Sequence, residues 1–338
     1  MAVAHPVETS NNMTGNGPAL VAIGGGTGMP SLLRGLTQFT THITAIVTVA
    51  DDGGSSGRLR REFGILPPGD FRSNIAALSR DEELMTQLLH YRFGGSISVG
   101  EDHSRNLQGH AFGNLLLAAL TGITGSFDEG LLAAQRVLAM RGRVVPSTLA
   151  DVELLADVII KKGDEEHRLE RITGESSITH AYGQIQRVYL NPSDVRAYPP
   201  ALRAIFQAQM ILIGPGSLYT SILPNLLVPD LTQALLLARA PKVYICNNAT
   251  QPGETGGYDV GDHVHAILQH LPENVITCVL ANDNFSVNEE NLGKTVFVKL
   301  SELGSIPLVT TDLIDEMRPW RHDSMKLAAA VSNLLDQT

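Results

Sequence analysis

The sequence predicts an α/β protein with a Rossmann-like, mostly parallel sheet, helices on both of its faces and a small β-rich insertion. Short apolar runs alternate with helical patterns over most of the chain, which is typical of a parallel sheet covered by helices. Several of those runs end in glycine-rich or asparagine turns, where open α/β sheets bind ligands. Between about 143 and 190 short β-branched runs replace the alternation and predict the insertion.

The elements before the insertion are predicted from apolar runs and helix-start signals. Apolar residues predict strands at 19–23 and 43–50. Pro30 suits the first turn of a helix to about residue 39, and Asp70 suits the N-cap of the next. Ser126 and Glu129 match a capping box that opens an amphipathic helix. The remaining expected elements are a helix at about 82–91, a mobile polar loop at 94–108 and a very apolar, central helix at 115–120.

The α/β pattern resumes near residue 200. Continuous apolar runs predict three further strands, at 210–213, 242–246 and 275–280. A final amphipathic helix is expected to begin at Asp323 or Ser324. No linker interrupts this pattern, so we expect residues 19–338 to form a single domain with the inserted lobe at about 143–190.

The composition is that of a globular chain without a general affinity for nucleic acid. The 338 residues are 43% hydrophobic and 18% charged, enough to bury a large core. The formal net charge of −10 repels phosphate backbones unless a local basic cluster overcomes it. Arg58, Arg60, Arg61 and Arg72 form such a cluster, although a solvated helix face explains it equally well.

Targeting and redox signals predict a cytoplasmic protein without a membrane span. Residues 1–18 are polar and lack the basic and apolar stretches of a signal peptide, so we expect a disordered N-terminal tail. No apolar run approaches the roughly 20 residues of a membrane helix. Cys246 and Cys278 lie in apolar runs without zinc spacing, which favours ordinary thiols in a reducing compartment.

Polar or glycine-rich turns at five predicted strand ends are the main functional signal. They span 24–28, 51–57, 214–217, 247–255 and 282–284. Carboxyl ends of parallel strands share one edge of a sheet, so we expect all five turns on one rim. Glycines allow a ligand to approach the backbone, and free N–H groups at helix starts hold anions. The rim is therefore predicted to bind a nucleotide.

The first turn is an incomplete dinucleotide fingerprint. Gly24 and Gly26 match it, but Met29 stands where the third glycine belongs. No Lys-Ser/Thr pair follows the glycines, which excludes a P-loop. Tight packing of a strand against a helix is an alternative reason for the glycines.

The second turn offers carboxylates and a phosphate grip. Asp51 suits ribose, a Mg²⁺ ion or a general base, and Asp52 suits the same roles or a structural one. Capping of the turn by both aspartates is the alternative. Ser55, Ser56 and Arg58 could together hold a phosphate.

The later turns add an anion site and a stacking candidate. Gly214, Gly216 and Ser217 link a strand to a helix start, although plain N-capping by Ser217 would explain that residue. Tyr258 ends a long polar loop and could stack on a ligand, or the loop could simply lie at the surface. Arg321 stands close to the start of the last helix, where it could reach a ligand.

Metal and covalent chemistry have little support in the sequence. None of the eleven histidines has a convincing ligand spacing, and His263 and His265 fall on different helix faces. His110 is expected to bond locally at its helix start. Neither cysteine has a recognisable catalytic setting.

Long strings of the sequence carry a family resemblance. They are IGGGTG at 23, TVADDGGSSGRLR at 48, GILPPGDFR at 64, GHAFGNLLLAALT at 109, RGRVVPST at 141, IGPGSLYTSILPNLLV at 213 and CNNATQPGETGGYDVGDHV at 246. In these strings the chain resembles the CofD-like superfamily and, within it, the YvcK-type gluconeogenesis factors, from about Ala19 through Asp323.

The resemblance implies a Rossmann-like fold that binds UDP-N-acetylglucosamine and a role in cell shape and cell-wall precursor control during gluconeogenic growth. It implies no established catalytic activity. The residues carried over to the nucleotide-sugar site are Gly25, Gly26, Thr27, Asp51, Gly214, Gly216, Ser217, Asn247 and Arg321. Small departures beside the site are Met29-Pro30 and the loop from Ser96 to Arg105.

Three functional hypotheses follow. The leading one is a nucleotide-sugar-binding regulator, expected to be a homo-oligomer with regulatory protein partners and without a firmly expected cofactor. The more distant CofD branch transfers a 2-phospholactyl group from a guanosine-linked donor to a deazaflavin with Mg²⁺, so a transferase using Asp51 or Asp52 is the alternative. The run GGSSG after these aspartates follows the YvcK-type pattern instead. An NAD-dependent oxidoreductase is the third hypothesis.

Overall fold

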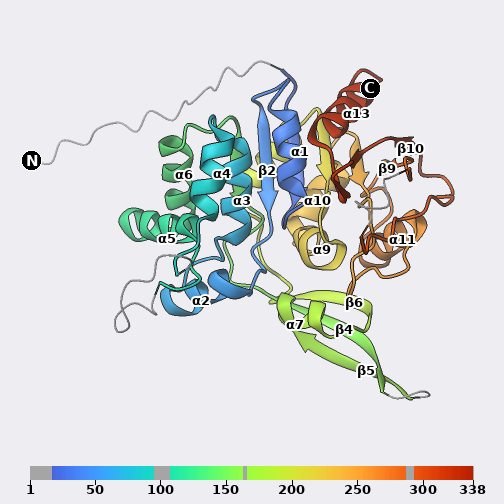
Figure 1. The fold of residues 1–338 in the computed structure, drawn as a ribbon, viewed down its shortest axis with the longest axis horizontal. Helices are drawn as coiled ribbons and strands as arrows, with labels where there is room; N and C mark the ends of the chain where they lie inside the picture. The colour runs from blue at the N-terminus through green and yellow to red at the C-terminus, as the bar shows by residue number, and fades with distance from the viewer. Residues whose placement is uncertain (1–16, 95–106, 163–165, 287–292, 338) are drawn as a thin grey trace, which may run out of the picture.

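The computed structural model describes residues 17–94, 107–162, 166–286 and 293–337 (Figure 1). A seven-stranded sheet of order β10-β9-β8-β7-β1-β2-β3 forms its centre, and all neighbouring strands in it are parallel. These strands are β1 (Leu20–Gly24), β2 (Ile43–Val47), β3 (Arg143–Pro146), β7 (Met210–Ile213), β8 (Lys242–Ile245), β9 (Cys278–Asn282) and β10 (Leu308–Thr311). The predicted Rossmann-like parallel sheet is confirmed.

The strand order reverses between β1 and β7. From β1 the chain continues outward to β2 and β3, whereas from β7 it continues to β8, β9 and β10 on the other side. Connections that leave two neighbouring strands in opposite directions open a crevice at their carboxyl ends, the usual ligand site of such sheets. The turns after β1 and β7 therefore lie side by side.

Helices cover both faces of the sheet, as the sequence predicts. On one face α1 (Met29–Leu36) packs against α3 (Gly69–Leu78) and α13 (Ser324–Leu335). On the other face α8 (Pro199–Gln207) crosses β2 and β3. The remaining helices are α2 (Gly54–Phe63), α4 (Glu82–His90), α5 (Phe112–Thr124), α6 (Phe127–Val137), α7 (Glu175–His180), the π-helix η1 (Leu218–Ile222), α9 (Leu223–Leu226), α10 (Pro229–Leu237) and α11 (Val260–His270).

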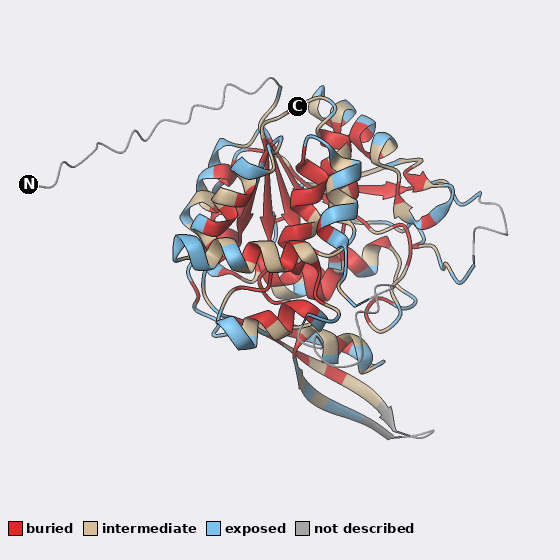
Figure 2. Cartoon of the chain, turned by 60° about the vertical axis from the view of Figure 1, so that its left-hand side comes forward, coloured by how far each residue is buried: buried red, intermediate tan, exposed pale blue. Residues whose placement is uncertain are grey.

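The core is centred on the inner strands (Figure 2). Every residue of β1, β2, β7 and β8 is buried. Their continuous apolar runs are what a strand covered on both faces requires. This buried sheet gives the turns at its carboxyl edge a rigid base.

A three-stranded antiparallel lobe projects from the body of the molecule (Figure 1). It consists of β4 (Glu153–Lys162), β5 (Glu166–Thr173) and β6 (Gln184–Asn191), with α7 packed on β4 and β5. The β-rich segment predicted at about 143–190 is therefore divided, because β3 joins the main sheet as its edge strand. A short hairpin of β11 (Ile314–Asp315) and β12 (Arg318–His322), which the sequence did not predict, precedes α13.

Several predictions need correction or fall outside the described residues. The apolar helix α5 is not central, since only Gly113, Asn114 and Leu117 are buried on it, and apolar content alone does not show where a helix packs. Asp70 is not an N-cap, because it lies inside the first turn of α3, after Pro68. The predicted tail up to residue 16 and most of the predicted polar loop, 95–106, lie outside the described residues.

Within the described ranges, no helix on its own combines the length and apolarity that membrane crossing requires; α5 and α6, bent by 116° from each other, meet that test only as a pair.

Candidate functional site

A cavity of about 680 Å³ opens at the carboxyl ends of β1, β7 and β8. Its size is within the usual range for small-molecule sites, about 300–1,000 Å³. The residues that line it are Thr27, Gly28, Ser31, Glu175, Thr179, Pro215, Gly216, Ser217, Thr220, Asn247, Ala249, Thr250, Gln251, Pro252, Glu254, Lys294, Thr295, Trp320, Arg321 and His322. Of the predicted site residues, the structure brings Thr27, Gly216, Ser217, Asn247 and Arg321 to this cavity.

Asn247 holds the turn after β7 in place. Its Oδ1 accepts a hydrogen bond from the Gly216 amide at 3.2 Å, and its Nδ2 donates to the Gly216 carbonyl at 2.8 Å. Gly214, with φ of +85°, adopts the left-handed conformation that glycine tolerates best. These contacts fix the backbone of the cavity wall before any ligand arrives.

Gln251 extends the same wall. Its Oε1 accepts from Asn247 Nδ2 at 3.2 Å, and its Nε2 donates to the Ser217 hydroxyl at 2.9 Å. Ser217 occupies the N-cap position of η1, as the alternative had it, but its side chain makes no capping hydrogen bond. The hydroxyl is instead part of the network that joins the turns after β7 and β8.

The turn after β1 approaches the β7 turn closely. A Cβ at Gly28 would lie 2.9 Å from the Pro215 carbonyl oxygen, so only glycine fits there without movement. The Gly26 amide already donates to Asp70 Oδ2 at 2.8 Å, and a side chain at Gly25 would collide with the same carboxylate. Gly25 and Gly26 therefore serve the packing of this turn, while Thr27 and Gly28 face the cavity.

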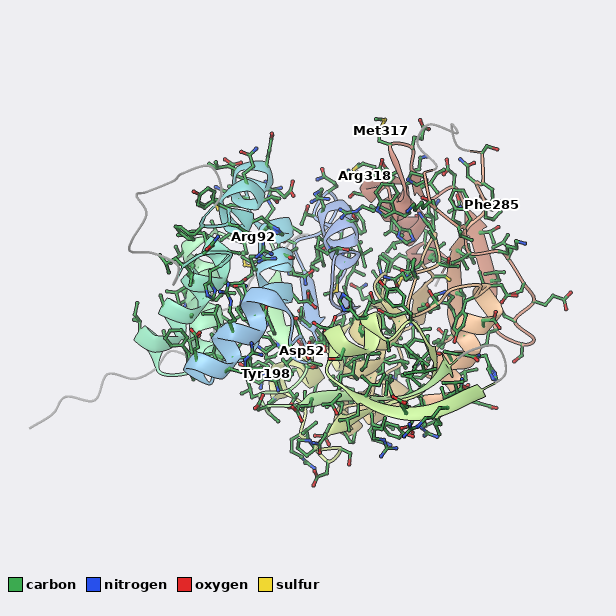
Figure 3. The ribbon with its side chains drawn as sticks, turned by 60° about the horizontal axis from the view of Figure 1, so that its bottom comes forward. Asp52, Arg92, Tyr198, Phe285, Met317 and Arg318 are labelled. Carbon is green, nitrogen blue, oxygen red and sulfur yellow. The ribbon has the colours of Figure 1, made fainter. Side chains whose placement is uncertain are left out.

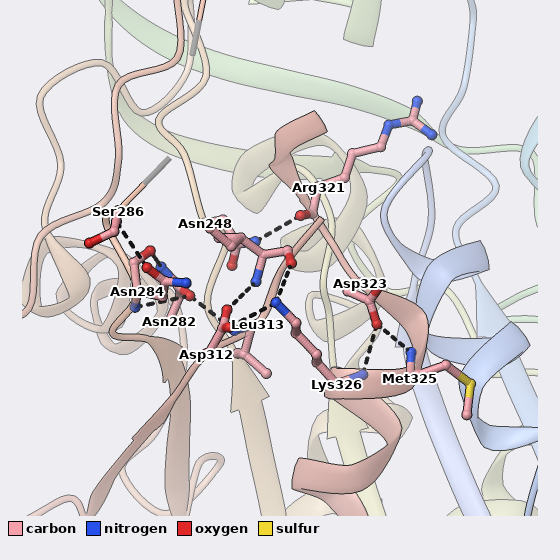
Figure 4. A network of polar contacts seen from close by, with 11 residues as sticks. Asn248, Asn282, Asn284, Ser286, Asp312, Leu313, Arg321, Asp323, Met325 and Lys326 are labelled. Atoms are coloured by element: carbon pink, nitrogen blue, oxygen red, sulfur yellow. Dashed lines mark hydrogen bonds and ion pairs between the residues drawn. The ribbon is translucent and has the colours of Figure 1, made fainter. Parts of the chain in front are cut away.

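Arg321 gives the cavity an unpaired cation. Its carbonyl accepts a hydrogen bond from Asn248 Nδ2 at 2.9 Å, which ties β12 to the end of β8. The guanidinium stands apart from this polar network (Figure 4), and within the described residues it has no hydrogen-bond or ion-pair partner. A guanidinium with free donors can bind a phosphate in a forked geometry.

The neighbours of Arg321 complete that wall. Trp320, the only tryptophan in the sequence, is 50% exposed and offers a face for stacking. Burial lowers the pKa of His322 to about 4, so at neutral pH its uncharged ring donates through Nε2 to the Cys246 carbonyl at 3.1 Å. Lys294 adds a second cation to the lining.

The aspartates of the second glycine-rich turn already accept hydrogen bonds from other groups of the protein. Asp51 accepts from the Gly53 amide at 2.8 Å and from Ser56. Asp52 accepts from the Ser176 amide at 3.0 Å and thereby joins the start of α2 to the lobe (Figure 3). Neither aspartate lines the 680 Å³ cavity, although Asp52 faces a smaller one of about 500 Å³.

The predicted phosphate grip does not reach the main cavity either. Ser55 is buried, and its Oγ is hydrogen-bonded to His110 Nδ1 at 2.9 Å and to Asn114 Nδ2 at 3.0 Å. Arg58 donates to the Gln108 carbonyl at 2.9 Å. His110 bonds locally through its backbone amide, which donates to the Leu107 carbonyl at 3.0 Å, but its ring bonds to Ser55, 55 positions earlier, a contact that sequence spacing cannot show.

Tyr258 faces other aromatic residues rather than the cavity. Its hydroxyl lies 2.8 Å from the Tyr219 hydroxyl, and its ring packs edge-on against Tyr219 and His263. The stacking role predicted for Tyr258 is not supported by this packing. Trp320 is the aromatic residue that the structure offers instead.

Five carboxyl groups lie close enough for electrostatic effects between them: Asp51, Asp52, Asp70, Glu175 and Glu254. Desolvation and the Asp51 charge raise the pKa of Asp70 to about 6. Burial raises the pKa of Glu254 and, together with neighbouring carboxylates, raises that of Glu175 well above its ordinary value. Both glutamates line the cavity.

No arrangement of three or more histidine, cysteine, aspartate or glutamate ligands suits a metal ion in the part of the chain that the structure describes. Cys246 and Cys278 are free thiols, and burial raises the pKa of Cys246 to about 12. Neither thiol lines the cavity.

Sequence reasoning assigned no role to five residues that line the cavity: Trp320, Lys294, Gln251, Glu254 and Glu175. Trp320 could have been found from its position beside Arg321. Gln251 and Glu254 lie in a loop that was recognised without a role for either side chain. Glu175 is delivered by the lobe, and nothing local in the sequence indicates its position.

Comparison with known proteins gives a consistent result. The family model described as 2-phospho-L-lactate transferase CofD matches residues 20–326. A Bacillus subtilis protein described as a gluconeogenesis factor is 44% identical over 333 residues, covering 96% of this chain and 100% of that protein. A Halalkalibacterium halodurans protein of the same description is 44% identical over 293 residues, covering 87% and 84%.

Two further matches differ in extent. A longer Nostoc relative is 52% identical over 251 residues, and this chain covers only 52% of its length. The crystal structure of a Bacillus halodurans protein superposes with a TM-score of 0.83 at 41% identity, covering 93% of this chain and 99% of that one.

Proposed function

This chain belongs to the CofD family and, within it, to the gluconeogenesis factors, and from that premise we propose that its cavity binds the nucleotide sugar UDP-N-acetylglucosamine. We propose further that binding makes it a cytoplasmic regulator of cell shape and cell-wall precursor metabolism during gluconeogenic growth, acting as a homo-oligomer with protein partners. The observation that carries the proposal is the Arg321 guanidinium, which has no partner among the described residues and lines a cavity at the β1/β7 switch point.

The lining of the cavity supports a ligand with distinct chemical parts. Arg321 and Lys294 suit a diphosphate, because both are cations on the cavity wall. Trp320 suits an aromatic base, since base–aromatic stacking is worth about 1–3 kcal/mol. Thr and Gln side chains and the carboxyl groups suit the hydroxyl and amide groups of a sugar.

A Mg²⁺-dependent transferase is the second candidate, favoured by the Asp51–Asp70 pair. A Mg²⁺ ion held largely by ligand phosphates needs only one or two protein carboxylates. Asp51 and Asp70 are near enough for the charge of one to raise the pKa of the other, but each already accepts a backbone hydrogen bond. These two residues would hold such an ion, which would neutralise phosphate charge during transfer.

Thermal shift and calorimetry separate the candidates. The full chain is titrated with UDP-N-acetylglucosamine, GDP and NAD, each with and without Mg²⁺. A ligand at 100 times its dissociation constant stabilises the folded state by about 2.7 kcal/mol. We expect a shift with the uridine sugar alone and no turnover. A GDP shift that needs Mg²⁺, with product formed on a deazaflavin, would favour the transferase, and stabilisation by NAD alone would reject both.

A further inference from the structure

The cavity is lined by carboxyl groups as well as cations. Arg321 comes from β12, whereas Glu175 is the first residue of α7 in the lobe. Among the described residues no ion pair joins Glu175 to Arg321 or to Lys294, although all three line the same cavity. Because these side chains do not pair with one another, each remains available to a different part of a ligand.

Contacts on both sides fix the position of Glu175. Asp52 accepts a hydrogen bond from the Ser176 amide at 3.0 Å, directly after Glu175. At the other end of α7, Thr179 Oγ1 donates to the Glu175 carbonyl at 3.1 Å, and Thr179 lies against Gly253, where a side chain would collide with it. The lobe is therefore held on the loop after β8 and the start of α2, and it brings Glu175 to the cavity wall.

Glu175 differs from Glu254 in its unused hydrogen-bonding capacity. Glu254 Oε2 accepts from the Tyr219 amide at 3.3 Å, and its Oε1 accepts from the Thr220 hydroxyl at 3.1 Å. Glu175 Oε2 is shielded from solvent and has no hydrogen-bond partner in the described structure. A buried polar atom without a partner destabilises the protein by about 1–3 kcal/mol, so a ligand that supplies a donor is favoured.

We propose that Glu175 makes the cavity selective for a nucleoside diphosphate esterified to a hydroxyl-bearing sugar over the same nucleoside diphosphate without the sugar. The inference rests on the proposed function and names the part of the ligand that this site discriminates. A sugar supplies hydroxyl and amide donors to the carboxyl oxygen. A free terminal phosphate instead supplies acceptors and additional negative charge, and the neighbouring carboxyl groups that raise the pKa of Glu175 disfavour that charge as well.

Hydrogen-bonding sites of this kind discriminate strongly. A site built to bond a donor rejects an analogue that lacks it, because its own polar group is then left without a partner. The lobe thereby gains a role in ligand choice, although it lies outside the main sheet.

The test is calorimetry of UDP-N-acetylglucosamine and UDP with the full-length wild type, Glu175→Ala and Glu175→Gln. We expect the wild type to prefer the sugar nucleotide. In Glu175→Ala the ratio of the UDP dissociation constant to the sugar-nucleotide dissociation constant should fall about tenfold or more. Glu175→Gln should bind UDP more tightly than the wild type while retaining part of its affinity for the sugar nucleotide, since the amide keeps an acceptor, cannot ionise and adds a donor that a phosphate can accept.

The matched control is Glu170→Gln on β5. Glu170 pairs with Arg168 at 3.5 Å and does not line the cavity, so both affinities should stay at wild-type values. An equal loss for both ligands in Glu175→Ala would assign Glu175 a merely structural role and overturn the inference, as would an unchanged ratio. If the wild type binds both ligands equally, the selectivity is rejected while nucleotide binding stands. If it binds neither, the proposed function fails as well.

Discussion

Two glycine-rich regions of this molecule look alike in sequence and differ in structure. The turns after β1 and β7 border an open cavity with a cation that has no described partner. The turn from Asp51 to Arg58 contains equally suitable side chains, but these already have partners within the protein. Asp51 accepts from the Gly53 amide, Asp52 accepts from the Ser176 amide, and Arg58 donates to the Gln108 carbonyl. The same kinds of chemical group therefore line a cavity in one region and stabilise the fold in the other.

The difference shows that hydrogen-bonding capacity, rather than residue type, identifies a binding site. A carboxylate or hydroxyl that already has backbone partners must lose them before it binds a ligand, at a cost of about 1 kcal/mol for each bond. Arg321 and Glu175 have capacity left within the described residues, whereas the Ser55 hydroxyl is buried and already bonds to both His110 and Asn114. Four substitutions test this difference between the two regions.

Arg321→Ala should have the largest effect on binding. Removing a charge-assisted bond to a phosphate costs about 1.5–3 kcal/mol, so we expect a 10- to 100-fold loss of affinity for UDP-N-acetylglucosamine by calorimetry. Thermal stability without ligand should be unchanged, because the guanidinium has no described partner. The same substitution at Arg58 should change affinity less than twofold. Equal effects at both positions would remove the distinction between the two regions.

Asp70→Asn tests the internally bonded region through pH. The pKa of Asp70 is raised from 3.8 to about 6, so the folded state binds this proton more tightly than the unfolded state and wild-type stability falls as pH rises from about 4 to 6. Asparagine keeps an acceptor for Gly26 and cannot ionise. The pKa difference sets a ceiling of about 3 kcal/mol, and partial exposure of the side chain reduces the expected gain to about half of that at pH 7.

Urea unfolding at pH 4 and pH 7 measures this gain. The variant should exceed the wild type at pH 7 and match it near pH 4. A gain of equal size at both values would show that ionisation of Asp70 is not its cause.

Asn247→Ala should affect binding and stability together. The side chain bonds to both the amide and the carbonyl of Gly216, so its loss frees the turn after β7. We expect about fivefold weaker binding, equivalent to about 1 kcal/mol, and a lower melting temperature. Asn247→Asp keeps the acceptor and loses the donor, so it should fall between alanine and wild type. Wild-type affinity in the alanine variant would argue against a preformed turn.

Asp51→Asn should have the smallest effect on nucleotide-sugar binding, below twofold, because Asp51 does not line the cavity. Calorimetry with and without Mg²⁺ gives the answer. A large loss confined to titrations that contain Mg²⁺ would instead support the transferase and would return Asp51 to the site that its sequence position suggests.

The sequence alone was enough to predict the parallel sheet and the edge of that sheet on which the glycine-rich turns lie. Continuous apolar runs predicted the buried strands, and β1, β2, β7 and β8 lie where these runs are found. Their glycine and asparagine endings predicted which edge carries the site. Such patterns are local, since burial on both faces requires apolar residues at every position of the strand.

Which side chains line the cavity depends on the tertiary structure. Asp70 bonds to Gly26 across 44 positions, Ser55 bonds to His110 across 55, and Glu175 comes to the cavity from a lobe outside the main sheet. Hydrogen bonds between distant segments depend on how the layers pack, and no local pattern in the sequence encodes them. The same holds for unused capacity, because within the described residues it is the fold that leaves the Arg321 guanidinium and Glu175 Oε2 without partners.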